Sequence, residues 1–186
     1  MSMMPSVSEC FSEETARLPA EFFEPRWYAA YTCAKHEKRV AVQFSQRSLE
    51  HFFPQYESMR RWKDRRVKLQ LPLFPGYVFV RLALRDRLRV LETPSVVRLV
   101  AFNGHPAALP DKEMEALRAC VAAQLVAEPC AYLTAGRRVR ITSGPLAELE
   151  GVLVRWKNTL RVVLSLDLIA SSAAVDVDAA NVESVP

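Results

Sequence analysis

Two pairs of residues in this chain have side chains that could do acid–base chemistry. His36 is followed directly by Glu37, and Glu148 and Glu150 share one loop. Such pairs act as general acid and base only where their side chains converge. Neighbouring helical residues point in different directions, so His36 and Glu37 do not converge. Glu148 and Glu150 have no nucleophile, metal-ligand set or phosphate-binding loop to work with. We therefore predict no catalytic residue and a protein that is not an enzyme; a hydrolase using isolated carboxylates is the weakest alternative.

The cysteine and histidine spacing predicts neither a metal site nor a cofactor site. No two cysteines form a C-x-x-C pair, and the histidines are far apart in the sequence. The residues concerned are Cys10, Cys33, Cys120, Cys130, His36, His51 and His105. We expect reduced thiols in a cytosolic protein.

The most informative stretch is the run from Leu71 to Arg81, which places a Pro75-Gly76 turn directly before a strand. Proline fixes φ and glycine accepts a positive φ, so the pair favours a tight turn. In the strand that follows, Tyr77 and Phe79 share one face and aliphatic residues occupy the other. Exposed aromatics of this kind are typical of protein-binding surfaces. We predict such a surface from Phe74, Tyr77 and Phe79, with ordinary core packing as the alternative.

A strongly basic window covers residues 59–68, which hold six basic residues against one acid. Basic side chains can bind phosphates, and an interleaved tryptophan can stack on a base. The predicted nucleic-acid contacts are Arg60, Arg61, Trp62, Lys63, Arg65, Arg66 and Lys68. A solvated charged hairpin is the alternative.

Composition indicates a globular chain rather than a membrane or secreted one. The 186 residues are 50% hydrophobic with a net charge of +4, a mild basic bias that permits nucleic-acid contact. No apolar run reaches the roughly 18 residues that a membrane span needs. Residues 1–25 carry several acids, unlike a signal peptide, and we expect them to be a loose tail. We expect a cytoplasmic protein with no membrane contact.

Hydrophobic periodicity predicts an α+β domain in the first two thirds of the chain. Its expected antiparallel sheet, packed with helices, comes from strands at residues 26–32, 52–56, 77–82 and 96–102 and helices at 35–49, 84–91 and 111–127. A charged, hairpin-like excursion at residues 60–71 precedes the Pro-Gly turn.

The remaining chain favours a small β-barrel. Short Val-rich strands are predicted at residues 138–142, 152–156, 160–165 and 174–177. We predict four parts: a tail at 1–25, the α+β domain at 26–127, a linker at 128–135 and the barrel at 136–186.

Three motifs together resemble the NusG family of transcription factors. They are Trp27-Tyr28 in the first strand, the run from Phe74 to Val80, and a Gly144-Pro-Leu segment that ends at Glu150-Gly151. The resemblance implies an NGN-like domain followed by an SH3-like KOW barrel. The charged hairpin is similar to specialised paralogs of the RfaH and UpxY type, and Glu148 stands where many relatives carry a small or aromatic residue.

The resemblance implies a transcription elongation and antitermination factor that suppresses pausing or termination. Phe74, Tyr77 and Phe79 would contact the clamp helices of the RNA polymerase β′ subunit, and the basic hairpin would reach non-template DNA. Asp86, Arg87 and Arg89 would face the gate loop of the β subunit. Leu168 and Ile169 would meet a ribosomal protein or the termination factor Rho, with burial in the barrel as the alternative. We expect a monomer.

One rival from another class is a ribosome- or RNA-associated KOW protein that never contacts polymerase. Such a protein would not need the aromatic surface of Phe74, Tyr77 and Phe79. A KOW domain that switches fold, as in RfaH, is a further alternative. Because the C-terminal segments are rich in valine, we predict a stable barrel.

Overall fold

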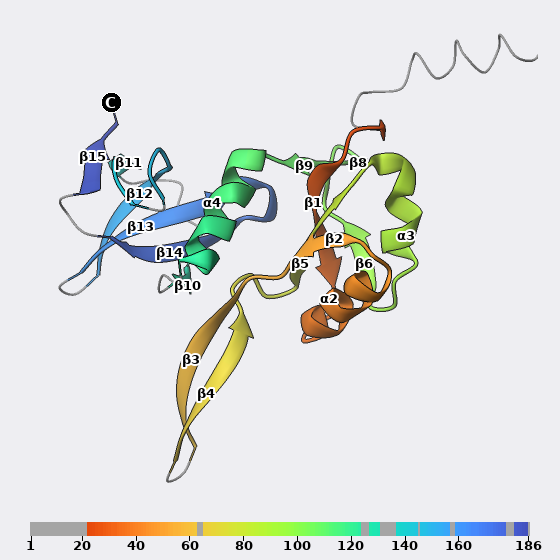
Figure 1. The fold of residues 1–186 in the computed structure, drawn as a ribbon, viewed down its shortest axis with the longest axis horizontal. Helices are drawn as coiled ribbons and strands as arrows, with labels where there is room; N and C mark the ends of the chain where they lie inside the picture. The colour runs from red at the N-terminus through yellow and green to blue at the C-terminus, as the bar shows by residue number, and fades with distance from the viewer. Residues whose placement is uncertain are drawn as a thin grey trace, which may run out of the picture.

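The computed structural model describes residues 22–62, 65–123, 127–130, 137–144, 146–156, 159–177 and 181–185. Residues 1–21, most of the predicted tail, lie outside this description. Two antiparallel sheets organise the described chain, one in an N-terminal module with three helices and one in a C-terminal β-module (Figure 1). The predicted α+β class with a strand-rich C-terminal part is confirmed.

The N-terminal sheet has the strand order β2-β5-β1-β6, and β9 also pairs with β1. Its strands are β1 (Arg26–Thr32), β2 (Glu50–Phe52), β5 (Tyr77–Leu82), β6 (Val96–Leu99) and β9 (Ala108–Leu109). Two hairpins branch from it: β3 (Gln55–Trp62) with β4 (Arg65–Pro72), and β7 (Ala101–Phe102) with β8 (His105–Pro106). The β3–β4 hairpin projects away from the rest of the molecule (Figure 1).

One face of this sheet is covered by α2 (Glu37–Gln46) and α3 (Arg87–Leu91), the latter preceded by the short 3₁₀ helix η2 (Leu84–Asp86). Val40, Ala41 and Phe44 of α2 recur at helical spacing and are all buried. The buried residues on this side form what we call the inner cluster: Tyr28, Ala30, Val40, Ala41, Phe44, Leu49, Val78, Val80, Leu82, Val90 and Leu99. All of them belong to the N-terminal module.

The opposite face packs in one hydrophobic cluster with α4 (Asp111–Ala122) and with the C-terminal β-module. The helix lies between the two sheets (Figure 1). We call this set the shared cluster. Its N-terminal members are Trp27, Ala29, Leu73, Phe74, Phe79, Leu109, Met114, Leu117 and Cys120, and its C-terminal members are Val139, Ile141, Leu146, Val162, Leu164, Leu166, Ile169, Ala173 and Val175.

The C-terminal sheet has the order β10-β14-β13-β12-β11-β15. Its strands are β10 (Ala127–Cys130), β11 (Arg137–Ile141), β12 (Glu150–Trp156), β13 (Thr159–Leu166), β14 (Ser171–Val177) and β15 (Val182–Ser184), with the 3₁₀ helix η3 (Asp167–Ile169) between β13 and β14. Burial alternates along the strands less strictly than in an open sheet, because β13 and β14 bury several consecutive residues.

The sequence-based boundaries were wrong at several places. The strand predicted at residues 52–56 is divided between β2, which ends at Phe52, and β3, which begins at Gln55. The helix α4 ends at Ala122 rather than near residue 127. Residues 127–130, expected at the end of that helix and in the linker, instead form β10 and pair with β14. Pro129 is compatible with this strand because β10 lies at the edge of the sheet.

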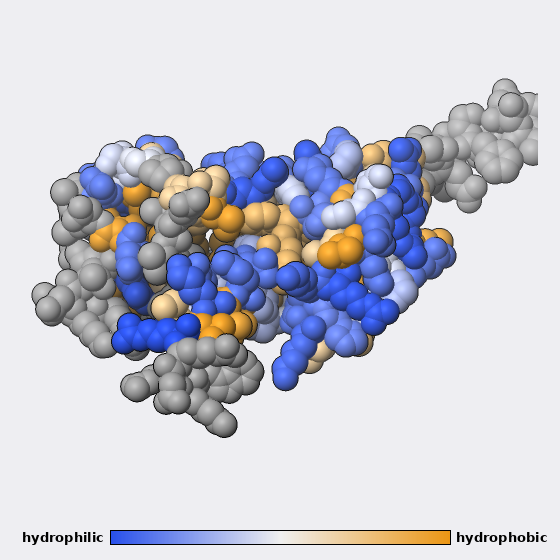
Figure 2. Space-filling model, turned by 60° about the horizontal axis from the view of Figure 1, so that its bottom comes forward, coloured by the Kyte–Doolittle hydropathy of each residue, from blue (hydrophilic) through white to orange (hydrophobic). Residues whose placement is uncertain are grey.

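Hydrophilic side chains cover most of the face seen in Figure 2, and apolar side chains appear there in separate patches. Within the part of the chain that the structure describes, no helix has the length and apolar character needed to cross a membrane.

Candidate functional site

The Pro75-Gly76 turn is held by two hydrogen bonds from elements distant in sequence. Gly76 has φ of +87°, a conformation that favours glycine. Its N–H donates to Oε1 of the buried Glu37 at 2.8 Å, and its carbonyl accepts from the Thr32 N–H at 2.8 Å. A Cβ at this position would also lie 3.3 Å from the Tyr31 ring. Thr32 of β1 and Glu37 of α2 therefore both fix the turn.

This turn positions an aromatic pair at the start of β5. Tyr77 lies opposite Tyr31 of β1, with ring centroids 5.5 Å apart, and Arg98 of β6 lies 5.7 Å from the Tyr31 centroid. Tyr31 is 37% exposed and Tyr77 is partly buried. Two phenol rings and a guanidinium thus meet at one end of the sheet, where they can contact a partner.

Phe74 and Phe79 are buried, which differs from the expectation of an exposed aromatic surface. They are 1% and 0% exposed and pack edge-to-face with centroids 5.6 Å apart. Met114 and Leu117 of α4 belong to the same cluster. The alternation of β5 correctly placed Tyr77 and Phe79 on one face, but the apolar stripe of α4 packs in that same cluster. Of the three predicted residues, only Tyr77 is partly accessible.

The predicted basic window forms the distal half of the β3–β4 hairpin. Its register places Arg61 opposite Arg66 and Trp62 opposite Arg65. Arg66 is exposed, and the Lys68 ammonium lies 2.9 Å from the Glu57 carboxylate. Lys63 and the side chains of Arg60, Arg61, Trp62 and Arg65 lie outside the described part of the structure. In the described backbone, the two strands that carry most of the window pair with each other in one hairpin.

The residues predicted at the short helix have different surroundings. Arg89 Nη2 donates to the Arg47 carbonyl at 2.8 Å, and Arg47 Nη1 donates to the Arg89 carbonyl at 3.1 Å. This reciprocal pair ties α3 to the end of α2. Asp86 lies 3.6 Å from Arg85, and Arg87 lines an apolar groove with Leu84 and Leu91 among others. Arg89 therefore connects α3 with the end of α2, whereas Arg87 lines the groove.

Leu168 and Ile169 both lie in η3. Ile169 is buried at 7% exposure and belongs to the shared cluster, and Leu168 is partly buried against it. Only Leu168 retains an accessible side chain for a partner.

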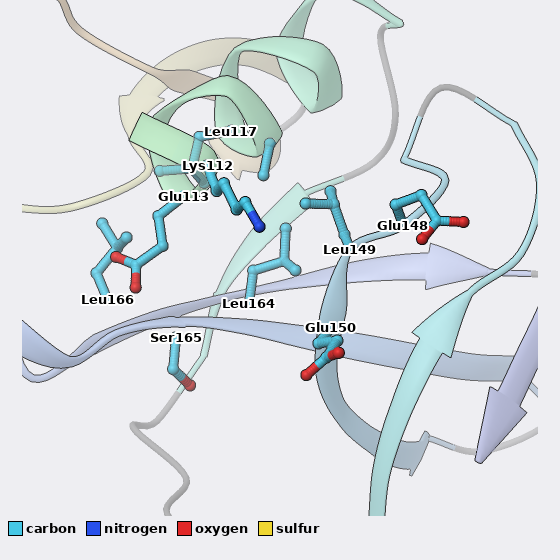
Figure 3. Close-up of a pocket in the computed structure, with 10 residues that line it drawn as sticks. Lys112, Glu113, Leu117, Glu148, Leu149, Glu150, Leu164, Ser165 and Leu166 are labelled. Atoms are coloured by element: carbon cyan, nitrogen blue, oxygen red, sulfur yellow. The ribbon is translucent and has the colours of Figure 1, made fainter. Parts of the chain in front are cut away.

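A cavity of about 310 Å³ lies between α4 and the C-terminal β-module (Figure 3). The helix contributes Lys112, Glu113, Ala116 and Leu117, and the β-module contributes Glu148, Leu149, Glu150, Leu164, Ser165 and Leu166. Burial raises the pKa of the Glu113 carboxyl to about 7, and the charge of Asp167 adds to this effect.

On the β-module wall of the same cavity, the pKa of a carboxyl is lowered and not raised. Arg140 Nη2 donates to Glu150 Oε1 at 2.7 Å, and this hydrogen bond lowers the pKa of the exposed Glu150 carboxyl.

In the helix α4, burial raises the pKa of the Cys120 thiol to about 11, so the thiol stays protonated near neutral pH. Among the described residues, no group of three His, Cys, Asp or Glu is placed to hold a metal ion.

Sequence reasoning missed Glu37 and Tyr31 as parts of the site. Glu37 was considered only with its neighbour His36, and its contact with Gly76 spans 39 residues, so no local pattern could reveal it. Tyr31 did have a signal, because strand alternation places it on the face of β1 that carries Trp27.

Comparison with known proteins agrees with this architecture. The family model described as transcription termination factor NusG matches residues 25–118. The transcription termination/antitermination proteins NusG of Escherichia coli K12 and Vibrio cholerae are each 28% identical over 176 residues, covering 85% and 86% of this chain and 95% and 96% of theirs. A solved structure of a domain interaction in Thermotoga maritima NusG shares the fold, with a TM-score of 0.54 and 22% identity over 88% of this chain and 99% of that one. Because the family model spans half of the chain and the curated relatives match most of it, this chain belongs to the NusG family of transcription termination and antitermination factors.

Proposed function

We propose that this protein is a transcription elongation and antitermination factor that binds the clamp of RNA polymerase and suppresses pausing or termination. The observation that carries the proposal is the Tyr31–Tyr77 pair, held beside a turn that Glu37 fixes from a distant helix. A rigid aromatic pair gives a large contact area at little entropic cost, which suits binding to a helical clamp. Bound factor would shift polymerase toward its closed, active state without doing chemistry itself.

Tyr77 makes the direct clamp contact in this proposal. Phe74 and Phe79, buried beneath, hold the strand and turn that present it. Arg87 in its groove and the partly buried Asp86 would face the gate loop of the β subunit, and Arg89 would keep that helix in place through its bonds with Arg47.

The β3–β4 hairpin would contact non-template DNA. Like charges directly opposite each other in a hairpin are destabilising, and the register sets Arg61 against Arg66. An anionic strand bound along the hairpin would offset that repulsion, and phosphate contacts supply sequence-independent affinity.

The C-terminal β-module would recruit a second partner, either the ribosome or Rho, through Leu168 with Ile169 supporting it from the core. We propose that the protein acts as a monomer in the cytoplasm. The alternative is a ribosome- or RNA-associated protein that does not act on polymerase.

A pull-down of purified RNA polymerase tests the central proposal. Wild type and Val42→Ala, which removes an exposed apolar side chain from α2 behind the sheet, should retain polymerase equally. Tyr77→Ala and Tyr31→Ala should each weaken retention by tenfold or more, as expected at a hot spot. Wild type that binds ribosomes or RNA and not polymerase would establish the alternative.

A second experiment tests the hairpin with single-stranded DNA. Replacing Arg66 and Lys68 by alanine should lower the slope of log affinity against log salt by about 0.7 for each lost phosphate contact. The matched control removes two exposed bases from α2, Lys38 and Arg39, and should leave the slope unchanged. Equal slopes for all three proteins would show that the hairpin does not bind DNA.

A further inference from the structure

The N-terminal module and the C-terminal β-module are packed together through α4. Ala116 and Leu117 of this helix are buried and line the same cavity as Leu149, Leu164 and Leu166 of the β-module. A pocket of about 310 Å³ that opens to solvent runs along this contact. The seam between α4 and the β-module is therefore an apolar contact with a solvent-accessible pocket along it.

Two acids at this seam interact through their charges. Glu113 lies in the first turn of α4, where it is partly buried and lines the cavity beside Leu166 (Figure 3). Asp167 begins η3, and its charge acts on Glu113. A carboxylate at such a position loses water when the β-module packs against the helix, and it also faces a second negative charge.

The other charged groups near the cavity are Lys112, Glu148, Glu150 and Arg140. Lys112 precedes Glu113 in α4, and its charge acts on Glu150 across the cavity. Glu148 and Glu150 add negative charge to the β-module wall, and Arg140 pairs with Glu150. No histidine is found among the described residues that line the cavity. At this seam, burial and the charge of Asp167 raise the pKa of the Glu113 carboxyl to about 7.

We propose that Glu113 is a proton-operated latch between the modules: its protonated form holds the C-terminal β-module against α4, and its ionised form releases the module. This inference concerns the contact between modules and goes beyond the proposed role in transcription.

The pH dependence of packing follows from the pKa of Glu113 in the packed and in the separated state. In the packed state the pKa of Glu113 is about 7, and in a separated state the carboxyl regains water and returns toward its ordinary value of 4.5. In the separated state, the positive N-terminal end of α4 also favours the ionised carboxylate of Glu113. Because the packed state binds the proton more tightly, packing is most favoured below the ordinary value and is lost as pH rises through about 7. The packing equilibrium should fall by up to about tenfold between roughly pH 6 and pH 8.

Amide ¹⁵N relaxation of the full chain measures this equilibrium, because packed modules tumble together and separated modules tumble faster. In wild type, the module correlation times should be equal at about pH 6 and should shorten and diverge by about pH 8. Glu113→Gln keeps the shape of the protonated side chain, so its modules should stay packed at both pH values. Asp167→Asn removes the facing charge and should leave more packed molecules than wild type at the higher pH.

Glu115→Gln is the matched control, because Glu115 is an exposed acid in the same helix. It should keep the wild-type pH response. Correlation times that do not change with pH in wild type would overturn the proposal, and so would a wild-type response that persists in Glu113→Gln. Neither measurement uses polymerase, so a failed latch is distinguishable from a failed transcription role.

Discussion

The inner and shared clusters use the two faces of one sheet in different ways. The inner cluster is closed by α2 and α3 within the N-terminal module, and its residues support that module alone. The shared cluster takes residues from both modules, with α4 between them. Phe74 and Phe79, predicted from sequence to form a binding surface, belong to the shared cluster. One face of the sheet therefore stabilises the N-terminal module alone, while the other face also joins the two modules.

The largest effect is expected in the inner cluster, at Phe44. Phe44→Ala removes a fully buried ring that packs against β2 and β5, and it should lower the free energy of unfolding of the N-terminal module by about 3–5 kcal/mol. Urea denaturation followed through amide signals of each module measures the loss.

The matched control for Phe44 is Phe102→Ala, because Phe102 is 70% exposed in the β7–β8 hairpin. It should change the unfolding free energy by less than about 0.5 kcal/mol. Equal losses for the two phenylalanines would contradict the assignment of the inner cluster as the core of this module.

The shared cluster should respond differently to the loss of a leucine from α4. Leu117→Ala deletes a buried side chain that lines the cavity at the seam, and it should cost about 2–4 kcal/mol. Part of that loss should appear as weaker packing between modules, seen as shorter correlation times at about pH 6. Leu88→Ala, at an exposed position of α3, is the control. If Leu117→Ala destabilised the N-terminal module without changing the tumbling of either module, the cluster would not join them.

A smaller effect is expected inside the β-module at Gly151. A Cβ there would lie 2.5 Å from Val162 Cγ1 and 2.7 Å from the Val163 carbonyl oxygen, so β12 and β13 would have to shift. Overpacking of this kind costs about 1–3 kcal/mol. Gly151→Ala should therefore lower the stability of the β-module and leave the inner cluster intact. Thermal unfolding with module-resolved amide signals checks this. Gly104→Ala is the comparison, because a Cβ at Gly104 would have open space but the residue has a φ of +82°, so any loss there reflects backbone strain and not overpacking.

The elements that depend on local pattern could be predicted from the sequence. The first strand was predicted at residues 26–32 and β5 at 77–82, and both match the structure. The signal of the first strand was its aromatic residues, and the signals of β5 were its aromatic and β-branched residues after the Pro-Gly turn. By contrast, β10 contains Pro129 and lacks alternation, and it is a strand only because β14 pairs with it. A pairing between such distant segments leaves no periodic signal in either one.

The same limit applies to the candidate site. Strand alternation placed Tyr77 and Phe79 on one face, but it could not say that α4 would pack over that face. The bond from Gly76 to Glu37 and the charge interaction between Glu113 and Asp167 join residues far apart in the sequence. Burial and charge proximity are tertiary properties, so residue types alone did not reveal the latch.

The smallest expected effect separates the two walls of the cavity at the seam. Glu150 faces the same cavity as Glu113, but it is exposed and bonded to Arg140. Its pKa is lowered, so any stability that it contributes is present above its ordinary pKa and is lost only as pH falls through the lower folded value. That range lies well below neutral pH. Glu150→Gln should therefore shift the melting temperature too little to detect, since exposed ion pairs contribute little. It should also leave the ¹⁵N relaxation response near neutral pH as in wild type. A flattened response in Glu150→Gln would assign the proton-sensitive contact to the β-module wall instead of α4.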